Sequence, residues 1–213
     1  MLASVLKREI APPKQARSRA RKAALIEQGI TALATHELDE ISIIDLTHSL
    51  GYSTGSFYSY FQNKTEFFIN IQEWVAAEQF EIISKNLCPE NVTTASLSTR
   101  LTMAIDTALA YFRRHTGVIR SALRYERRIP QAWAPNRATT RLIIASVTAG
   151  LTEDQKKDLE KAIQLAYGLM VNALLHNPGP LALDDDNLGT ELLDVLSPFL
   201  AQKEHQSTIT IKM

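Results

Sequence analysis

The sequence has very little cysteine and no long apolar run, and both absences narrow the class of protein. Cys88 is the only cysteine among the 213 residues, so one chain can form neither a disulfide framework nor a cysteine-based metal cluster. This usage suits a reducing compartment, and we expect a cytoplasmic protein. No apolar stretch approaches the roughly 18 to 20 residues that a membrane span requires, since Asn172 interrupts the run from Leu169 to Leu175. We therefore expect no membrane partner.

The sequence also lacks the motifs of common catalytic and cofactor sites. Its 8 glycines are scattered and form no nucleotide-binding loop. Its 5 histidines form no zinc-binding pair, and Asp45 with His48 has no third ligand nearby in the sequence. No G-x-S-x-G nucleophile elbow is present. We expect no catalytic residue, metal site or cofactor, and an enzyme would have to use an unrecognised site.

The formal net charge is zero, which taken alone argues against a nucleic-acid-binding protein. The distribution of charge argues for one. Within the first 22 residues Glu9 is the only acidic residue, and the basic ones are Lys7, Arg8, Lys14, Arg17, Arg19, Arg21 and Lys22. Basic charge is thus concentrated at the N-terminal end, next to the most specific pattern in the sequence.

That pattern runs from Ser42 to Glu66 and predicts two short helices joined by a tight turn. Ser42 with Asp45 forms a capping box that starts the first helix, which should end at Leu50. Gly51 supplies the permissive backbone of the turn, and Ser53 caps the second helix, which brings Phe57, Tyr60 and Phe61 to the core. The arrangement is that of a helix-turn-helix.

A third helix begins directly after this motif. Asn63 is its predicted cap, with Glu66 at the third position, so Lys64 is the first helical residue. A lysine beside free backbone N–H groups makes a good phosphate site. The second helix has a short polar outer face that could reach base edges in a major groove, although the same composition suits an ordinary helical hairpin with aromatic packing. The polar face consists of Ser53, Thr54, Gly55, Ser56, Tyr58 and Ser59.

A resemblance favours the DNA-binding interpretation. Gly51 to Glu66, GYSTGSFYSYFQNKTE, resembles the TetR-family signature G-[VY]-S-x-G-[ST]-[LF]-Y-x-[HY]-F-x-[NS]-K-x-[DE]. Ser42 to Leu46 resembles the family's opening of helix two. The sequence departs from the family at Thr47 and Leu50, where alanines are usual, and at residues 36–38, where His-Glu-Leu replaces a Gly-aromatic pair. The resemblance covers roughly residues 18–78.

The resemblance implies a DNA-binding transcriptional regulator, most often a repressor that a small-molecule effector releases from a palindromic operator. It implies a homodimer, which would present two recognition helices to such a site. It also implies contact positions for double-stranded DNA, with Tyr58, Tyr60 and Lys64 mainly on phosphates. Those positions are Ser42, Ser53, Thr54, Gly55, Ser56, Tyr58, Tyr60 and Lys64, to which we add Arg19 from helix one.

The periodicity along the whole chain predicts an all-α fold of about nine helices, with a three-helix DNA-binding domain followed by a helical bundle. We expect a flexible basic arm at 1–16, which either contacts DNA or is a solvated tail, a helix-turn-helix domain at 17–64 and a connecting helix four at 64–86. A regulatory and dimerisation domain follows at 89–201, and a polar tail at 202–213. Helix one should run from about Arg17 to Thr35, and the loop between the two parts should lie between Cys88 and Ala95.

Two regions of the second part suggest partners. The apolar faces of 153–176 and 187–200 either form the dimer interface, as in the family, or fill the monomer core. Aromatic and guanidinium groups in the middle of this second domain could bind the effector, and Arg120 with Arg124 would favour an anion. For any single one of these residues, however, a role in the core or at the surface is the more common one. The candidate ligand residues are Tyr111, Arg120, Arg124, Tyr125 and Trp133. A regulator without a ligand, acting through a protein partner, is the alternative and would lack a cavity of roughly 300 Å³.

Overall fold

The computed structural model describes residues 13–176 and 179–201, and every regular element in these ranges is an α-helix. The all-α prediction is confirmed, with ten helices where about nine were expected. The additional one is α5, a single turn that starts at a proline, the residue best suited to a first helical position. None of these helices is both long and apolar enough to span a membrane. The helices are α1 Pro13–Leu33, α2 Ile43–Ser49, α3 Thr54–Tyr58, α4 Lys64–Asn86, α5 Pro89–Val92, α6 Leu97–Arg114, α7 Thr116–Tyr125, α8 Pro130–Val147, α9 Glu153–His176 and α10 Leu188–Ala201.

The chain divides into two compact units, an N-terminal unit Met1–Ile71 and a C-terminal unit Gln72–Met213. The boundary lies inside α4, the helix predicted as the connector, whereas the loop between the two parts was predicted at Cys88–Ala95. The 23 residues of α4 form one uninterrupted helix because apolar residues recur along all of it and no glycine or proline breaks it. The N-terminal unit therefore includes the first two turns of α4.

The N-terminal unit is built around an aromatic cluster. Phe57, Phe61 and Phe67 are at most 1% exposed, and their ring centroids lie between 4.9 and 5.2 Å apart. Gly29 on α1 makes room for this cluster, since a Cβ there would lie 2.4 Å from the Phe67 ring. Helix α1 begins at Pro13 and ends at Leu33, so residues 13–16 of the predicted arm are helical. The rest of that arm, residues 1–12, and the predicted tail at 202–213 lie outside the described residues.

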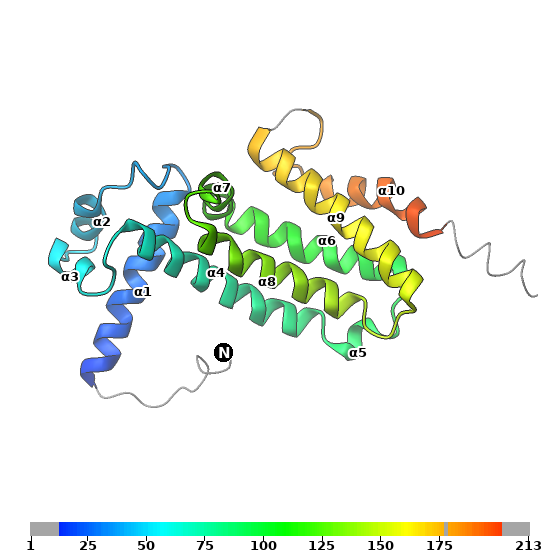
Figure 1. Ribbon diagram of the computed structural model, residues 1–213, viewed down its shortest axis with the longest axis horizontal. Helices are drawn as coiled ribbons and strands as arrows, with labels where there is room; N and C mark the ends of the chain where they lie inside the picture. Colours follow the sequence, from blue (N-terminus) through cyan, green and yellow to red (C-terminus); the bar gives the residue numbers. More distant parts are fainter. Residues whose placement is uncertain (1–12, 177–178, 202–213) are drawn as a thin grey trace, which may run out of the picture. The chain divides into compact units, whose positions relative to one another are not determined.

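The C-terminal unit is organised around α6, which packs against α7, α8, α9 and α10 (Figure 1). Helices α9 and α10 also pack against each other. α8 begins at Pro130, three residues before the predicted start at Trp133, because a proline fits the first turn of a helix. α9 begins with the predicted capping box: the Gln155 amide donates to Thr152 Oγ1, and the Thr152 amide donates to Gln155 Oε1.

A buried arginine ties three segments of this unit together. Arg100 on α6 is only 3% exposed, and its guanidinium donates to four backbone carbonyls. The acceptors are Ala95 at 3.1 Å, Thr93 at 3.0 Å, Val147 at 3.1 Å and Ala149 at 2.7 Å. The segment before α6 and the C-terminal end of α8 are therefore held by one side chain.

Candidate nucleic-acid interface

Side-chain caps start both helices of the helix-turn-helix, as predicted. Ser42 Oγ accepts from the Asp45 amide at 3.2 Å, and Ser53 Oγ accepts from the Ser56 amide at 3.3 Å. Between the two helices Gly51 has a φ of +68°, a conformation that side-chain-bearing residues rarely adopt. The turn and both helix starts are thus determined locally, and they fix the register of α3.

The outer face of α3 is accessible within the N-terminal unit. Tyr58 is 56% exposed, Ser53 and Gly55 are exposed, and Thr54 and Ser56 are half-buried. Phe57, the next residue before Tyr58, points into the aromatic cluster and holds the helix from the other side. A short helix with its small polar residues outward and one aromatic anchor inward has the shape that entry into a major groove requires.

Tyr60 differs from its prediction as a core residue. It is half-buried, and its hydroxyl lies 3.1 Å from Ser18 Oγ on α1. This contact holds the phenol at the surface beside the basic end of α1. Sequence reasoning did not single out Ser18, because one serine in an exposed helix carries no signal until the fold brings it to Tyr60.

Lys64 begins α4, and the cap around it is complete. The Glu66 amide donates to Asn63 Oδ1 at 2.9 Å, and the Gln62 amide donates to Glu66 Oε2 at 2.7 Å. Lys64 Nζ donates to the Asp39 carbonyl at 2.9 Å, which holds the half-buried side chain against the loop before α2. An ammonium group has three donors, so this bond leaves capacity for a phosphate oxygen.

The first turns of α1 add basic charge. Arg17, Arg19 and Arg21 are all exposed, and α1 has no acidic residue in its first turn. The Arg21 guanidinium lies 5.8 Å from the centroid of the Tyr52 ring, and Lys22 Nζ lies 5.5 Å from that of Phe61. These contacts position part of the basic surface by cation–π attraction. Ser42, the remaining predicted contact residue, is half-buried and serves as a cap.

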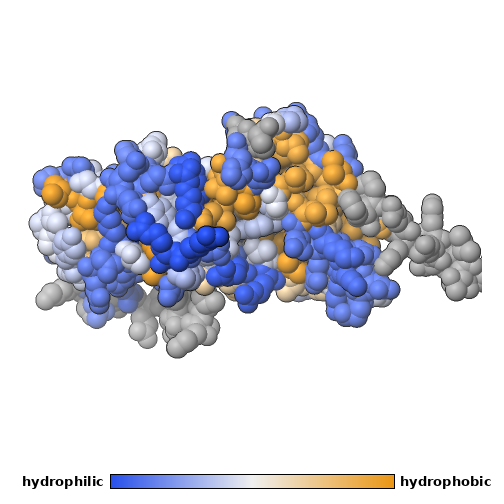
Figure 2. Space-filling model, turned by 45° about the horizontal axis from the view of Figure 1, so that its top comes forward, coloured by the Kyte–Doolittle hydropathy of each residue, from blue (hydrophilic) through white to orange (hydrophobic). Residues whose placement is uncertain are grey.

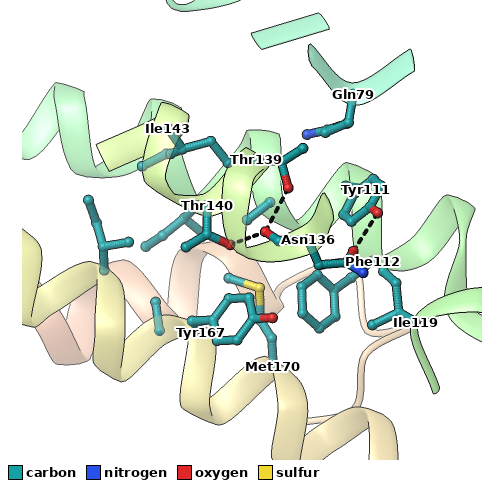
Figure 3. Close-up of a pocket in the computed structure, with 15 residues that line it drawn as sticks. Gln79, Tyr111, Phe112, Ile119, Asn136, Thr139, Thr140, Ile143, Tyr167 and Met170 are labelled. Atoms are coloured by element: carbon teal, nitrogen blue, oxygen red, sulfur yellow. Dashed lines mark hydrogen bonds between the residues drawn. The ribbon is translucent and has the colours of Figure 1, made fainter. Parts of the chain in front are cut away.

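The C-terminal unit contains an interior cavity of about 30 Å³ between α4, α6, α7, α8 and α9 (Figure 3). Of the five predicted ligand residues only Tyr111 lines it. Arg120, Arg124, Tyr125 and Trp133 do not, so the structure does not bring the predicted anion-binding set to this cavity. The fifteen lining residues are Gln79, Ala104, Ile105, Ala108, Tyr111, Phe112, Ile119, Asn136, Thr139, Thr140, Ile143, Ile163, Ala166, Tyr167 and Met170.

The polar groups of the cavity wall converge on Asn136. The Tyr111 hydroxyl donates to Asn136 Oδ1 at 2.6 Å, and Asn136 Nδ2 donates to Gln72 Oε1 on α4 at 2.9 Å. Gln72 in turn donates to the Val118 carbonyl at 3.2 Å. Sequence reasoning missed Asn136 and Gln72, because single amides within amphipathic helices look the same whether they face solvent or a cavity.

A buried histidine lies beside this network. His115 is 6% exposed, its ring centroid is 5.4 Å from that of Tyr111, and Nε2 is 3.6 Å from Glu78 Oε2. Burial lowers the pKa of His115, the Glu78 carboxylate partly opposes that shift, and Arg114, itself 2.6 Å from Glu78, adds to it. The neutral imidazole is therefore the form that the fold favours.

This histidine should make the C-terminal unit sensitive to acid. The unfolded chain takes up the proton near pH 6.5 and the folded chain only at lower pH, so stability should fall as the pH drops below about 6.5. We expect the melting temperature of His115→Gln to fall less between pH 7.5 and 5.5 than that of the natural chain. His176→Gln, which removes an exposed histidine of the same unit, is the control. Equal pH dependence in all three proteins would contradict this assignment.

The fold is that of the TetR family of transcriptional regulators, in which a small N-terminal helix-turn-helix unit precedes a larger helical bundle. A TetR transcriptional regulator from Rhodococcus sp. RHA1 superimposes with a TM-score of 0.53 at 16% identity, over 87% of this chain and 98% of that chain. A protein from Mesorhizobium loti assigned to the same family superimposes with a TM-score of 0.66 at 16% identity, over 87% and 97%. No family model and no curated protein matches the sequence.

Proposed function

We propose that the chain is a transcriptional regulator that binds double-stranded DNA through α3. The observation that carries this proposal is the accessible polar face of α3, with Tyr58 56% exposed, next to Lys64 and the basic start of α1. The TetR-family fold of the chain supports it. Selection of bound fragments from genomic DNA, followed by measurement of affinity for the recovered sequence, tests it. Failure to enrich any sequence would overturn it.

We further propose that the chain acts as a two-fold dimer through α9 and α10. Leu165 on α9 is 48% exposed and Val195 on α10 is 59% exposed, and Figure 2 shows apolar side chains gathered on this side of the C-terminal unit. Gly168, one turn from Leu165, is exposed and has open space around it, so another helix could approach closely. Symmetric pairing of these helices would bury the apolar surface.

Light scattering tests the dimer. The natural chain is expected to have twice the mass of one chain at micromolar concentration, and the double variant Leu165→Glu, Val195→Glu is expected to be monomeric, because it would bury like charges at the centre of the interface. Phe80→Glu is the matched control, since Phe80 is 43% exposed on α4, outside the proposed interface. A monomeric natural chain, or a dimeric double variant, would refute the assignment.

Lys64 provides a test of the phosphate role. Lys64→Ala is expected to weaken binding to all DNA sequences alike and to reduce the slope of log K against log salt by about 1, since one phosphate contact is lost. Ser56→Ala is the comparison. It should change the preference among sites by about 1 to 3 kcal/mol, the value of one good base contact. Loss of affinity in Lys64→Ala with an unchanged salt slope would mean that Lys64 acts only through its bond to Asp39.

Two modes of regulation remain as proposals. In the first, the chain is a repressor, and an effector in the C-terminal unit releases it from a palindromic operator through Gln72 and Gln79, which α4 contributes to the network and to the cavity wall. In the second, the chain binds no ligand and acts through a protein partner. The cavity of about 30 Å³ is far below the roughly 300 Å³ of a usual ligand pocket, so the first mode requires a side chain of the cavity wall to move and the second does not. Titration of the DNA complex with the probes described below separates them.

A further inference from the structure

The cavity wall carries no formal charge. None of its fifteen residues is an aspartate, glutamate, lysine or arginine. Burial is the main cause of the raised pKa of both phenols in the wall, Tyr111 and Tyr167, so both are neutral under ordinary conditions. A charged ligand would lose its hydration here and find no opposite charge, which is strongly unfavourable.

The polar groups of the wall are few, and they lie together. The Tyr111 hydroxyl and the Asn136 amide are bonded to each other, and the hydroxyls of Thr139 and Thr140 donate to the Asn136 carbonyl at 2.9 and 3.0 Å (Figure 3). The rest of the wall is aliphatic or aromatic, with Phe112, Ile143 and Met170 among its larger members. Such a wall matches an apolar molecule with one polar end.

The size of the ligand is set by the volume that a side chain of the cavity wall vacates when it moves. A cavity of about 30 Å³ holds about one water molecule, whereas an apolar cavity of about 150 Å³ binds benzene. Tyr167 is half-buried, and its ring packs edge-on against Phe112 with centroids 5.4 Å apart. Outward rotation of this one side chain would vacate the volume of a six-membered ring, and the flexible Met170 could adjust beside it.

From these observations we infer that the cavity binds a neutral, largely apolar molecule of about one aromatic ring, whose single hydroxyl or carbonyl bonds to the Tyr111–Asn136 pair once Tyr167 has moved outward. The inference rests on the proposed function, because it names the chemical class of the effector. It replaces the anionic ligand that Arg120 and Arg124 suggested in the sequence.

Three probes of one size test the charge preference on the full chain. Benzyl alcohol is neutral, benzoate is an anion, and benzylamine is a cation at neutral pH. At the same millimolar concentration, benzyl alcohol is expected to raise the melting temperature by roughly 3 °C, and the two ions should leave it unchanged. An equal or larger rise with either ion, or no rise with benzyl alcohol, would overturn the inference.

Two variants test the site. Tyr167→Ala removes the ring that must move, so benzyl alcohol should bind about tenfold more tightly by calorimetric titration. Tyr111→Phe keeps the ring but removes the hydroxyl, so binding should weaken about fivefold. Unchanged affinity in both variants would place the probe elsewhere and refute the site.

Affinity for the selected DNA, measured without any probe, distinguishes this inference from the proposed function. A chain that binds DNA but does not respond to benzyl alcohol would overturn the inference and leave the proposed function standing. A chain that binds benzyl alcohol as described but binds no DNA would support the neutral site and overturn the proposed function.

Discussion

Replacement of Phe57 with alanine is expected to lower the free energy of unfolding of the N-terminal unit by about 3 to 5 kcal/mol. Phe57 is fully buried, and its ring lies 5.2 Å from that of Phe61 and 5.1 Å from that of Phe67. The variant would lose the transfer free energy of the ring and leave a cavity between two other aromatic rings. Chemical denaturation followed by circular dichroism measures the change.

DNA binding should be lost with it. The free energy of unfolding of a small domain is only about 5 to 15 kcal/mol, so this loss removes much of it. In addition, Phe57 is the residue that packs α3 against the aromatic cluster. Tyr58→Ala is the matched control, because the neighbouring ring is 56% exposed. It should leave the stability within about 1 kcal/mol and still weaken DNA affinity. Retained stability in Phe57→Ala would show that the aromatic cluster does not hold the unit together.

Arg100→Ala is expected to destabilise the C-terminal unit by about 3 to 5 kcal/mol. The guanidinium is buried and donates to four backbone carbonyls, at distances from 2.7 to 3.1 Å. Without it, four carbonyls lose a donor, and each one that stays shielded from water, as the buried bond to Val147 is, costs about 1 to 3 kcal/mol. The thermal unfolding midpoint of the natural chain and the variant, measured side by side, shows the effect.

Two further variants separate charge from geometry at this position. Arg100→Lys keeps the positive charge but cannot reach four acceptors with a planar fork, so it should recover only part of the stability. Arg113→Ala removes another guanidinium from α6, one that is exposed and donates to the carbonyls of Leu183 and Asp185. Its effect should be smaller, because water can replace an exposed donor. A loss in Arg100→Ala no larger than that in Arg113→Ala would contradict this account.

The sequence predicted those parts of the fold that depend on local chemistry. The caps at Ser42, Ser53 and Thr152 and the turn at Gly51 all have the predicted geometry, because each depends on residues at most three positions apart. The boundary between the units was predicted at a polar loop but lies inside α4. Composition marks a loop, whereas a division within a helix depends on which neighbours each half contacts.

The two candidate sites also differ in how far they depend on local sequence. The α3 surface could be predicted, because a single short segment carries both the helix and its polar face. The cavity could not, because Gln72, Tyr111 and Asn136 come from three helices and meet only in the folded unit. Arg120 and Arg124 are spaced one helical turn apart, but neither lines the cavity. Helical spacing shows that two residues share a face of a helix, but it does not show what that face contacts.

The caps of the N-terminal unit bear on the thermodynamics of the proposed DNA binding. α3 has only five residues, far fewer than an isolated helix needs, so it depends on the cap at Ser53 and the anchor at Phe57, both of which the N-terminal unit itself supplies. The surface is thus preorganised, and binding need not include the ordering of this segment. Calorimetry should therefore find a heat capacity change that rigid docking of the buried area explains, without the larger negative contribution that coupled folding adds.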